Sequence, residues 1–255
     1  MSPTLTRDAA RDHVSVHRPA RIVVDAVDGR SRARVLEAGT FVSPRPMPGR
    51  GAGVKIALVG IRASLCAGDD FALRVEVGPG ARVELVDPNG TVAFNARGGA
   101  ASWRAELTLG EGAVVHWREQ PFVLADGADV HREVRADLAP GAELLWRETL
   151  VLGRSGEHGG ALRSLTRVTH GGHDLLVEDL DLRTPAAREL PGILGTARVL
   201  GQVALFGRTP PGDPSPSRLD LVGAGALHRA VTHRAYETDR ILDPVWSSWS
   251  DDRLR

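Results

Sequence analysis

The stretch FALRVEVGPGARVELVD, residues 71–87, decides the fold class. Apolar side chains alternate with charged ones through residues 73–77 and again through residues 82–85. A period of two is typical of β-strands that have one buried face and one solvated face. Between the two runs lies Gly78-Pro79-Gly80, and glycine adopts the positive φ angles of a tight turn at little cost. The stretch therefore predicts a ribbon of strand, turn and strand.

The same ribbon recurs three more times along the chain. The later turns are Gly110-Glu111-Gly112, Ala139-Pro140-Gly141 and His170-Gly171-Gly172-His173, and successive turns are 32, 29 and 31 residues apart. A single ribbon cannot bury its own apolar face, whereas stacked ribbons can. We therefore predict a mostly all-β fold of stacked β-hairpins in a layered or solenoid-like body, with residues 1–255 forming one domain.

Both ends of the chain depart from this pattern. Residues 1–20 show no periodicity, so we expect them to be frayed. Near the C-terminus, apolar residues recur four positions apart, at Leu227, Val231 and Ala235. This spacing predicts a short amphipathic helix over 227–241, which ends before Asp243-Pro244 because proline pushes the preceding residue out of the helical region. A second short helical turn is expected at 246–249.

Composition excludes several classes of protein. Lys and Arg together number 32, as do Asp and Glu, so the net charge is zero and neither nucleic acid nor an anionic membrane is an expected partner. No run approaches the ~20 apolar residues of a membrane span, and the N-terminal stretch has no apolar signal core. The single cysteine, Cys66, excludes an internal disulfide framework and a cysteine-based zinc site. We expect a cytoplasmic protein.

The residues themselves suggest no catalytic centre, because the phosphate-loop, zinc-protease and serine-elbow motifs are all absent. His170 and His173 flank a turn, where they can meet at a metal or lie solvated. His116 is placed on a sheet face by the alternation around it, and Asp69 precedes a strand, where a carboxylate commonly binds turn N–H groups. Glu119 and Glu148 each close a Trp-Arg-Glu triplet, which is typical of exposed Arg–Glu pairs of little energetic weight.

Several short motifs in order carry a resemblance to a known family. They are Gly29-Arg30-Ser31-Arg32, Gly68-Asp69, Val75–Ala81, Trp117–Phe122, Trp146-Arg147-Glu148, Leu152-Gly153-Arg154 and Gly156-Glu157. In this order and spacing the chain resembles the urease accessory protein UreD, also called UreH. It departs from the family pattern in lacking a P-G-G ahead of Gly68. It also has Val92 and Phe94 where the family has a lysine and a tyrosine.

The resemblance implies an all-β body and a non-enzymatic chaperone and scaffold. Such a protein binds apo-urease and, together with UreF and the GTPase UreG, helps nickel insertion into the urease active site. No tightly bound cofactor is expected, only transient nickel(II), for which carboxylate and imidazole are suitable ligands. The candidate residues for ion transit are Asp69, Glu148 and His116. The candidates for a partner surface are Leu227, Val231 and Ala235.

Two other functions remain open from the sequence alone. Repeated ribbons also suit a β-solenoid enzyme that cleaves polysaccharides with a carboxylate pair in a groove. The aromatic content of 4% argues against that enzyme, because aromatic side chains commonly stack on sugars. The third alternative is a plain β-sheet protein-interaction module with no role in metal handling.

Overall fold

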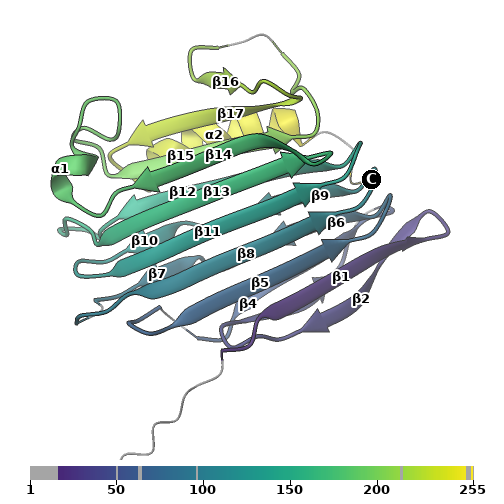
Figure 1. Cartoon of the computed structure of the whole chain (residues 1–255), viewed down its shortest axis with the longest axis horizontal. Helices are drawn as coiled ribbons and strands as arrows, with labels where there is room; N and C mark the ends of the chain where they lie inside the picture. The colour runs from purple at the N-terminus through teal and green to yellow at the C-terminus, as the bar shows by residue number, and fades with distance from the viewer. Residues whose placement is uncertain are drawn as a thin grey trace, which may run out of the picture.

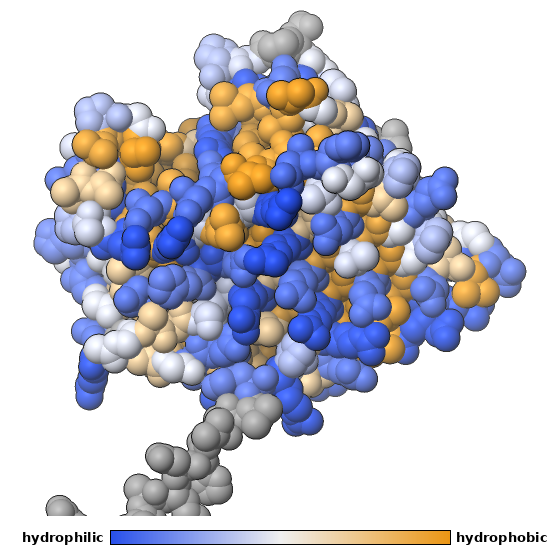
Figure 2. All heavy atoms as spheres, in the orientation of Figure 1, coloured by the Kyte–Doolittle hydropathy of each residue, from blue (hydrophilic) through white to orange (hydrophobic). Residues whose placement is uncertain are grey.

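Two β-sheets lie face to face in a computed structural model that describes residues 17–49, 51–62, 65–95, 97–212, 215–250 and 254 (Figure 1). The first sheet has the strand order β14-β13-β11-β8-β5-β1-β2. Its strands are β1 (Ala20–Val27), β2 (Arg30–Glu37), β5 (Asp70–Val77), β8 (Ala101–Leu109), β11 (Asp129–Leu138), β13 (Ala161–His170) and β14 (His173–Asp181). Figure 2 shows its outer surface, which is largely hydrophilic.

The second sheet has the order β16-β17-β15-β12-β9-β6-β4-β3, and outside this order β10 pairs with β12 and β7 pairs with β10. Its strands are β3 (Val42–Met47), β4 (Val54–Gly60), β6 (Arg82–Val86), β7 (Thr91–Ala93), β9 (Val114–Arg118), β10 (Phe122–Leu124), β12 (Glu143–Leu152), β15 (Val199–Phe206), β16 (Arg218–Asp220) and β17 (Gly225–Thr232). Two helices complete the fold, α1 (Pro185–Arg188) and α2 (Ala235–Trp249).

The mostly β, solenoid-like fold expected from the sequence is confirmed, but three of the four ribbons are not hairpins. At each of these turns the chain passes from one sheet to the other, joining β5 to β6, β8 to β9 and β11 to β12. Each strand then pairs in parallel with its counterpart in the next coil. The alternation of a strand is the same in a hairpin and in a coil of two facing sheets, so the local pattern does not distinguish them.

Only the fourth ribbon is a hairpin, in which β13 and β14 pair antiparallel around Gly171 and Gly172. The glycines at the other three corners have the positive φ expected of them, +66° at Gly80, +64° at Gly112 and +71° at Gly141. A side chain is strained in this region, which explains why each corner uses glycine.

The core lies between the sheets and contains a column of aromatic rings. Phe71 stacks on Trp103 with ring centroids 5.0 Å apart, and Trp117 stacks on Trp146 at 6.0 Å. Both pairs are register partners on neighbouring parallel strands, so the coil-to-coil stacking of strands also stacks their side chains. Trp103 and Trp117 connect the two pairs across the sheets at 6.3 Å.

The helix predicted over 227–241 is misplaced. Leu227 and Val231 belong to strand β17, and the helix begins at Ala235. Residues four apart share a face of a strand as well as of a helix, so the spacing fits both. The helix also runs through Pro244, and the turn expected at 246–249 is its last part.

Helix α2 lies on the outer face of the second sheet, over β12, β15 and β17. Leu242 and Trp249 pack there with a separate apolar cluster formed by Leu145, Val203, Leu205, Ala226 and Ala230. At its first turn, the Glu237 carboxylate accepts the backbone N–H groups of His233 and Arg234. Packing and capping together hold the helix despite the hydrogen bond that Pro244 removes.

The frayed segment predicted at 1–20 lies mostly outside the described residues, since the description starts at residue 17 and β1 begins at Ala20. The assignment of residues 1–255 to one domain stays a prediction.

A substitution at Gly201 on β15 tests how α2 packs on the second sheet. A Cβ atom at this position clashes with Thr238 Cγ2 and lies 2.9 Å from Leu242 Cδ1. We expect Gly201→Ala to lower the free energy of unfolding by about 1–3 kcal/mol, as overpacking does. Urea unfolding measures this change. The matched control is Gly60→Ala on β4, where the nearest described atom lies at 3.7 Å; equal losses in both variants would contradict the packing described.

Candidate functional site

A row of polar side chains crosses the inner face of the second sheet. Strand pairing sets Glu148 of β12 opposite Gln202 of β15, and Gln202 opposite Arg229 of β17. Glu119 directly follows β9, and its N–H donates to the carbonyl of Arg147, which places it beside Glu148. Glu119, Glu148 and Gln202 are buried. A protein core rarely holds such groups unless they are paired.

The facing sheet contributes a cation to this row. Arg132 on β11 has a side chain that is 0% exposed. Its Nη2 atom lies 3.0 and 3.1 Å from the two carboxylate oxygens of Glu119, and its Nη1 atom lies 2.8 Å from Glu148 Oε2. The guanidinium carbon also lies 4.4 Å from the ring centre of Trp103 and 5.6 Å from that of Trp146. One guanidinium therefore serves two buried carboxylates and rests on aromatic rings.

Hydrogen bonds continue the row toward β14. Gln202 Nε2 donates to Glu148 Oε1, and Arg229 Nε donates to Gln202 Oε1 at 3.1 Å. Arg229 Nη2 then donates to Glu178 Oε2 at 2.7 Å, and both of these side chains are 26% exposed. We call Glu119, Arg132, Glu148, Gln202, Arg229 and Glu178 the inner polar row. It starts in the core and ends where solvent has access.

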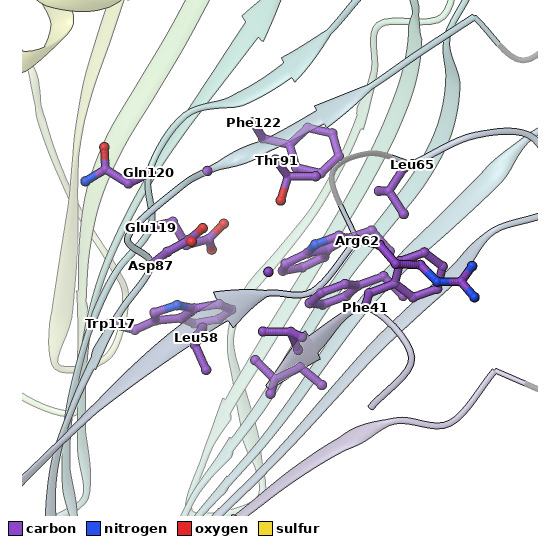
Figure 3. A pocket seen from close by; sticks show the side chains of 16 residues that line it. Phe41, Leu58, Arg62, Leu65, Asp87, Thr91, Trp117, Glu119, Gln120 and Phe122 are labelled. Atoms are coloured by element: carbon purple, nitrogen blue, oxygen red, sulfur yellow. The ribbon is translucent and has the colours of Figure 1, made fainter. Parts of the chain in front are cut away.

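A cavity of about 60 Å³ adjoins the Glu119 end of the row. Figure 3 shows the carboxylates of Asp87 and Glu119 near one another on one side, with Phe41, Leu58 and Phe122 elsewhere on the wall. Trp117 also lines it, and the buried Trp117 Nε1 has no hydrogen-bond acceptor within the described part of the chain. The volume holds a few water molecules, and the donors and acceptors on its wall suit a polar occupant.

Burial raises the pKa values of the acidic side chains at this end of the row. Desolvation raises the pKa of Glu119 to about 7, although the Arg132 charge and the indole N–H of Trp146 oppose that shift. Burial likewise raises the pKa of Glu148 and that of Asp87. Near neutral pH, a proton therefore competes with the guanidinium for the Glu119 carboxylate.

Comparison with known proteins identifies the family. The family described as UreD urease accessory protein matches residues 18–254. The chain is 50% identical to urease accessory protein UreD 1 of Streptomyces griseus over 221 residues, 87% of each chain. It is 31% identical to urease accessory protein UreD of Streptomyces avermitilis over 234 residues, 87% of this chain and 93% of that one.

The chain belongs to the UreD urease accessory protein family. It is a non-catalytic factor of urease maturation, which removes the polysaccharide-cleaving enzyme from the alternatives. The family resemblance read from the sequence motifs is thereby confirmed.

The structure places the three transit candidates of this UreD-family chain in different surroundings. Glu148 lies in the inner polar row. His116 points to the opposite face of β9, where it is buried and meets Trp246 of α2 edge-on at 6.2 Å. The Asp69 carboxylate accepts the N–H of Cys66 at 2.8 Å, as a turn carboxylate does. The three residues therefore do not form one site.

The two Trp-Arg-Glu triplets are not the exposed Arg–Glu pairs that the sequence suggested. Consecutive residues of a strand point to opposite faces, so Glu119 and Glu148 face inward and their neighbours Arg118 and Arg147 face outward. The outward arginines bind Asp243 of α2. The inward glutamates bind Arg132 instead, and their pairs are buried.

Sequence reasoning missed Arg132, although a signal for it exists. In the strand 129–138 the alternation sets Arg132 on the same face as Val130, Val134 and Ala136. A lone arginine on the apolar face of a strand is a buried charge that requires partners. The same reasoning finds Gln202 within the continuous apolar strand 199–206.

The described residues contain no group of three or more His, Cys, Asp or Glu side chains arranged to hold a metal ion. His170 and His173 are register partners in the β13–β14 hairpin and stand without a third such ligand in the described ranges. No helix in the described part of the chain is long and apolar enough to span a membrane.

The raised pKa of Glu119 predicts a pH dependence of stability. A carboxyl group with a raised folded-state pKa stabilises the fold fully below its unfolded pKa of 4.5, and that contribution is lost as the pH rises through about 7. We therefore expect the free energy of unfolding to fall from about pH 5 to pH 7, and to fall less in Glu119→Gln. Urea unfolding at a series of pH values measures both slopes. Equal slopes would show that Glu119 titrates normally.

Proposed function

We propose that this chain binds apo-urease and acts with UreF and UreG to insert nickel, and that the ion crosses the chain along the inner polar row. The observation that carries the proposal is a row of polar side chains that runs from a cavity to a solvent-accessible end in a member of the UreD family. Its buried part holds the carboxylates of Glu119 and Glu148 and the amide of Gln202. The chain acts on the ion as cargo and performs no reaction on it.

The chemistry of the row suits transit rather than storage. Nickel(II) accepts oxygen ligands such as those of Glu119, Glu148 and Gln202. Conduction requires several weak sites in sequence, because a tight site does not release the ion. Carboxylates that are spread along the row, with no three-ligand metal cluster among the described residues, fit that requirement.

Burial supports a functional role for the row as well. Charged groups in a core are expensive, and a buried ion pair commonly stabilises a fold no better than apolar residues of the same size. Buried ionisable groups with raised pKa values that adjoin a cavity are therefore candidates for function. Glu119 meets these criteria, the partly buried Asp87 lines the same cavity with a raised pKa, and Glu148 has a raised pKa beside Glu119.

We further propose that α2 forms a partner surface, on which UreF binds. Of the three residues expected there from the sequence, Leu227 is buried in the core and cannot contact a partner. Val231 is 45% exposed, but it lies on the same face of β17 as Leu227 and Arg229, opposite to the face that α2 covers. Ala235 is partly exposed at the start of α2. Tyr236 and Ile241 on the same helix are also exposed apolar residues, which suit a protein interface.

Glu148→Gln tests the ion route, since it removes the charge and keeps the shape. Urease expressed with this variant should contain several-fold less nickel per active site at an unchanged protein level, because a charged ligand is missing from the route. Metal analysis of purified urease and its activity measure this effect. The matched control is Glu106→Gln on the outer face of β8, where the side chain is 52% exposed.

The same assay decides between the remaining alternatives. Asp69→Ala and His116→Ala test the two candidates that lie outside the row, and each should lower nickel content if its residue shapes the route. Full nickel content in Glu148→Gln and Glu119→Gln would favour the interaction module with no role in metal handling.

Tyr236→Asp combined with Ile241→Asp tests the partner surface on α2. The two charges should reduce co-purification of UreF with this chain, because each places a carboxylate in an apolar contact. Quantified pull-down from co-expressing cells measures the loss. Ile61→Asp is the matched control, since Ile61 is also exposed and follows β4, near the far edge of the second sheet. Undiminished capture by the double variant would remove this surface from the proposal.

A further inference from the structure

The inner polar row already holds a cation of its own. Arg132 fills the position between Glu119 and Glu148, contacting both carboxylates at 2.8–3.1 Å. A divalent ion bound by these two carboxylates has to occupy the same position. The guanidinium and the ion carry charge of the same sign, so within a few ångströms of each other they repel strongly in a buried site.

The contacts of Arg132 are incomplete in a way that sets it apart from a locked structural arginine. Its Nε atom has no hydrogen-bond acceptor among the residues that the structure describes. One face of the guanidinium rests on Trp103, a stacking contact that imposes no directional bond. Trp103 and Glu119, which both contact Arg132, are also walls of the 60 Å³ cavity, so the cavity lies one side chain away from the arginine.

We propose that Arg132 is a built-in cation that closes the inner polar row, and that the Glu119–Glu148 pair takes up a divalent cation only when this side chain is displaced. This inference rests on the proposed function, because it names how the same route is regulated. With the guanidinium in place the pair is occupied and no ion is held there. With it displaced, the carboxylates of Glu119 and Glu148 both lose their guanidinium partner and become available to one ion.

Direct metal binding tests the inference without urease. Purified full-length chain is titrated with Ni²⁺ alone by calorimetry at pH 7.5, as wild type and as Arg132→Gln. The variant should gain one Ni²⁺ site that is about tenfold or more tighter than any site of the wild type, because a repelling charge has been removed. Ni²⁺ should also raise the Tm of the variant more than that of the wild type.

Two further variants locate the gained site. Arg132→Gln combined with Glu119→Gln and Glu148→Gln should lose the gain, since the carboxylates are gone. Arg135→Gln removes an arginine from the same strand, where the side chain is 60% exposed and pairs with Glu133, and it should bind Ni²⁺ as the wild type does. A gain that survives the triple change, or appears in Arg135→Gln, would overturn the inference.

Arg132→Gln leaves two buried carboxylates unpaired and can fail to fold without metal. Folding that is restored by Ni²⁺ supports the inference. If neither condition gives folded protein, Arg132→Lys decides, because an ammonium group retains the charge but cannot make the forked contacts to both carboxylates. Arg132→Lys should bind Ni²⁺ more tightly than the wild type. Unchanged affinity in a folded Arg132 variant would overturn the inference.

The results separate this inference from the ion route. A Ni²⁺ site in Arg132→Gln together with normal nickel delivery by Glu148→Gln would sustain the closing role of Arg132 and end the proposed route. Reduced delivery by Glu148→Gln with no Ni²⁺ site in the Arg132 variants would sustain the route and end the closing role.

Discussion

The structure depends on the in-register stacking of successive coils. Parallel pairing of β9 with β12 sets Trp146 on Trp117, and the same register brings Glu148 beside Glu119. The aromatic rings gain from this arrangement, whereas two carboxylates at neighbouring buried positions repel one another. A repeat that places identical side chains next to one another therefore needs a cation from outside the stack to balance its neighbouring carboxylates. Arg132 of the facing sheet supplies it, so core packing and charge pairing across the two sheets follow from one constraint.

The alternation of side chains along each strand divides each Trp-Arg-Glu triplet between two surfaces. The tryptophans and glutamates build the interior, while Arg118 and Arg147 reach the outer face and bind Asp243 of α2. The helix is thereby tied to the back of the strands that carry the inner polar row. It packs on β12, β15 and β17, which hold Glu148, Gln202 and Arg229. A protein bound to the exposed face of α2 is therefore separated from the row by the helix and one layer of strands.

The alternation of residues 71–87 and its three recurrences predicted the strands, the glycine corners and the fold class. It did not predict which strands pair, because the partner of each strand lies one coil away and both arrangements bury one face. The spacing of Leu227, Val231 and Ala235 was wrongly assigned to a helix, because a step of four residues fits a strand as well as a helix. Such errors come from patterns that two structures share.

The polar site was less predictable for a related reason. Glu148 was identified, but Glu119 and Glu148 were paired with the arginines adjacent to them in sequence, which lie on the opposite face of each strand. Their true partner lies in the other sheet and is found only once the coil is closed. Arg132 lies on the same face of β11 as Val130, Val134 and Ala136. This pattern indicates from the sequence that a charged side chain enters the core.

The energetics of the row fit a protein that passes an ion on. Replacing a buried ion pair with apolar residues is often neutral or stabilising, so Glu119, Arg132 and Glu148 do not owe their place to stability alone. The guanidinium and a proton compete for the two carboxylates, because burial raises the pKa of Glu119 to about 7 and also raises that of Glu148. In the proposed route, a divalent cation competes with both. An ion that enters the row has to displace these competitors, which lowers its apparent affinity. A carrier that has to take up an ion and then release it requires weak binding, whereas a storage site or a metalloenzyme requires tight binding.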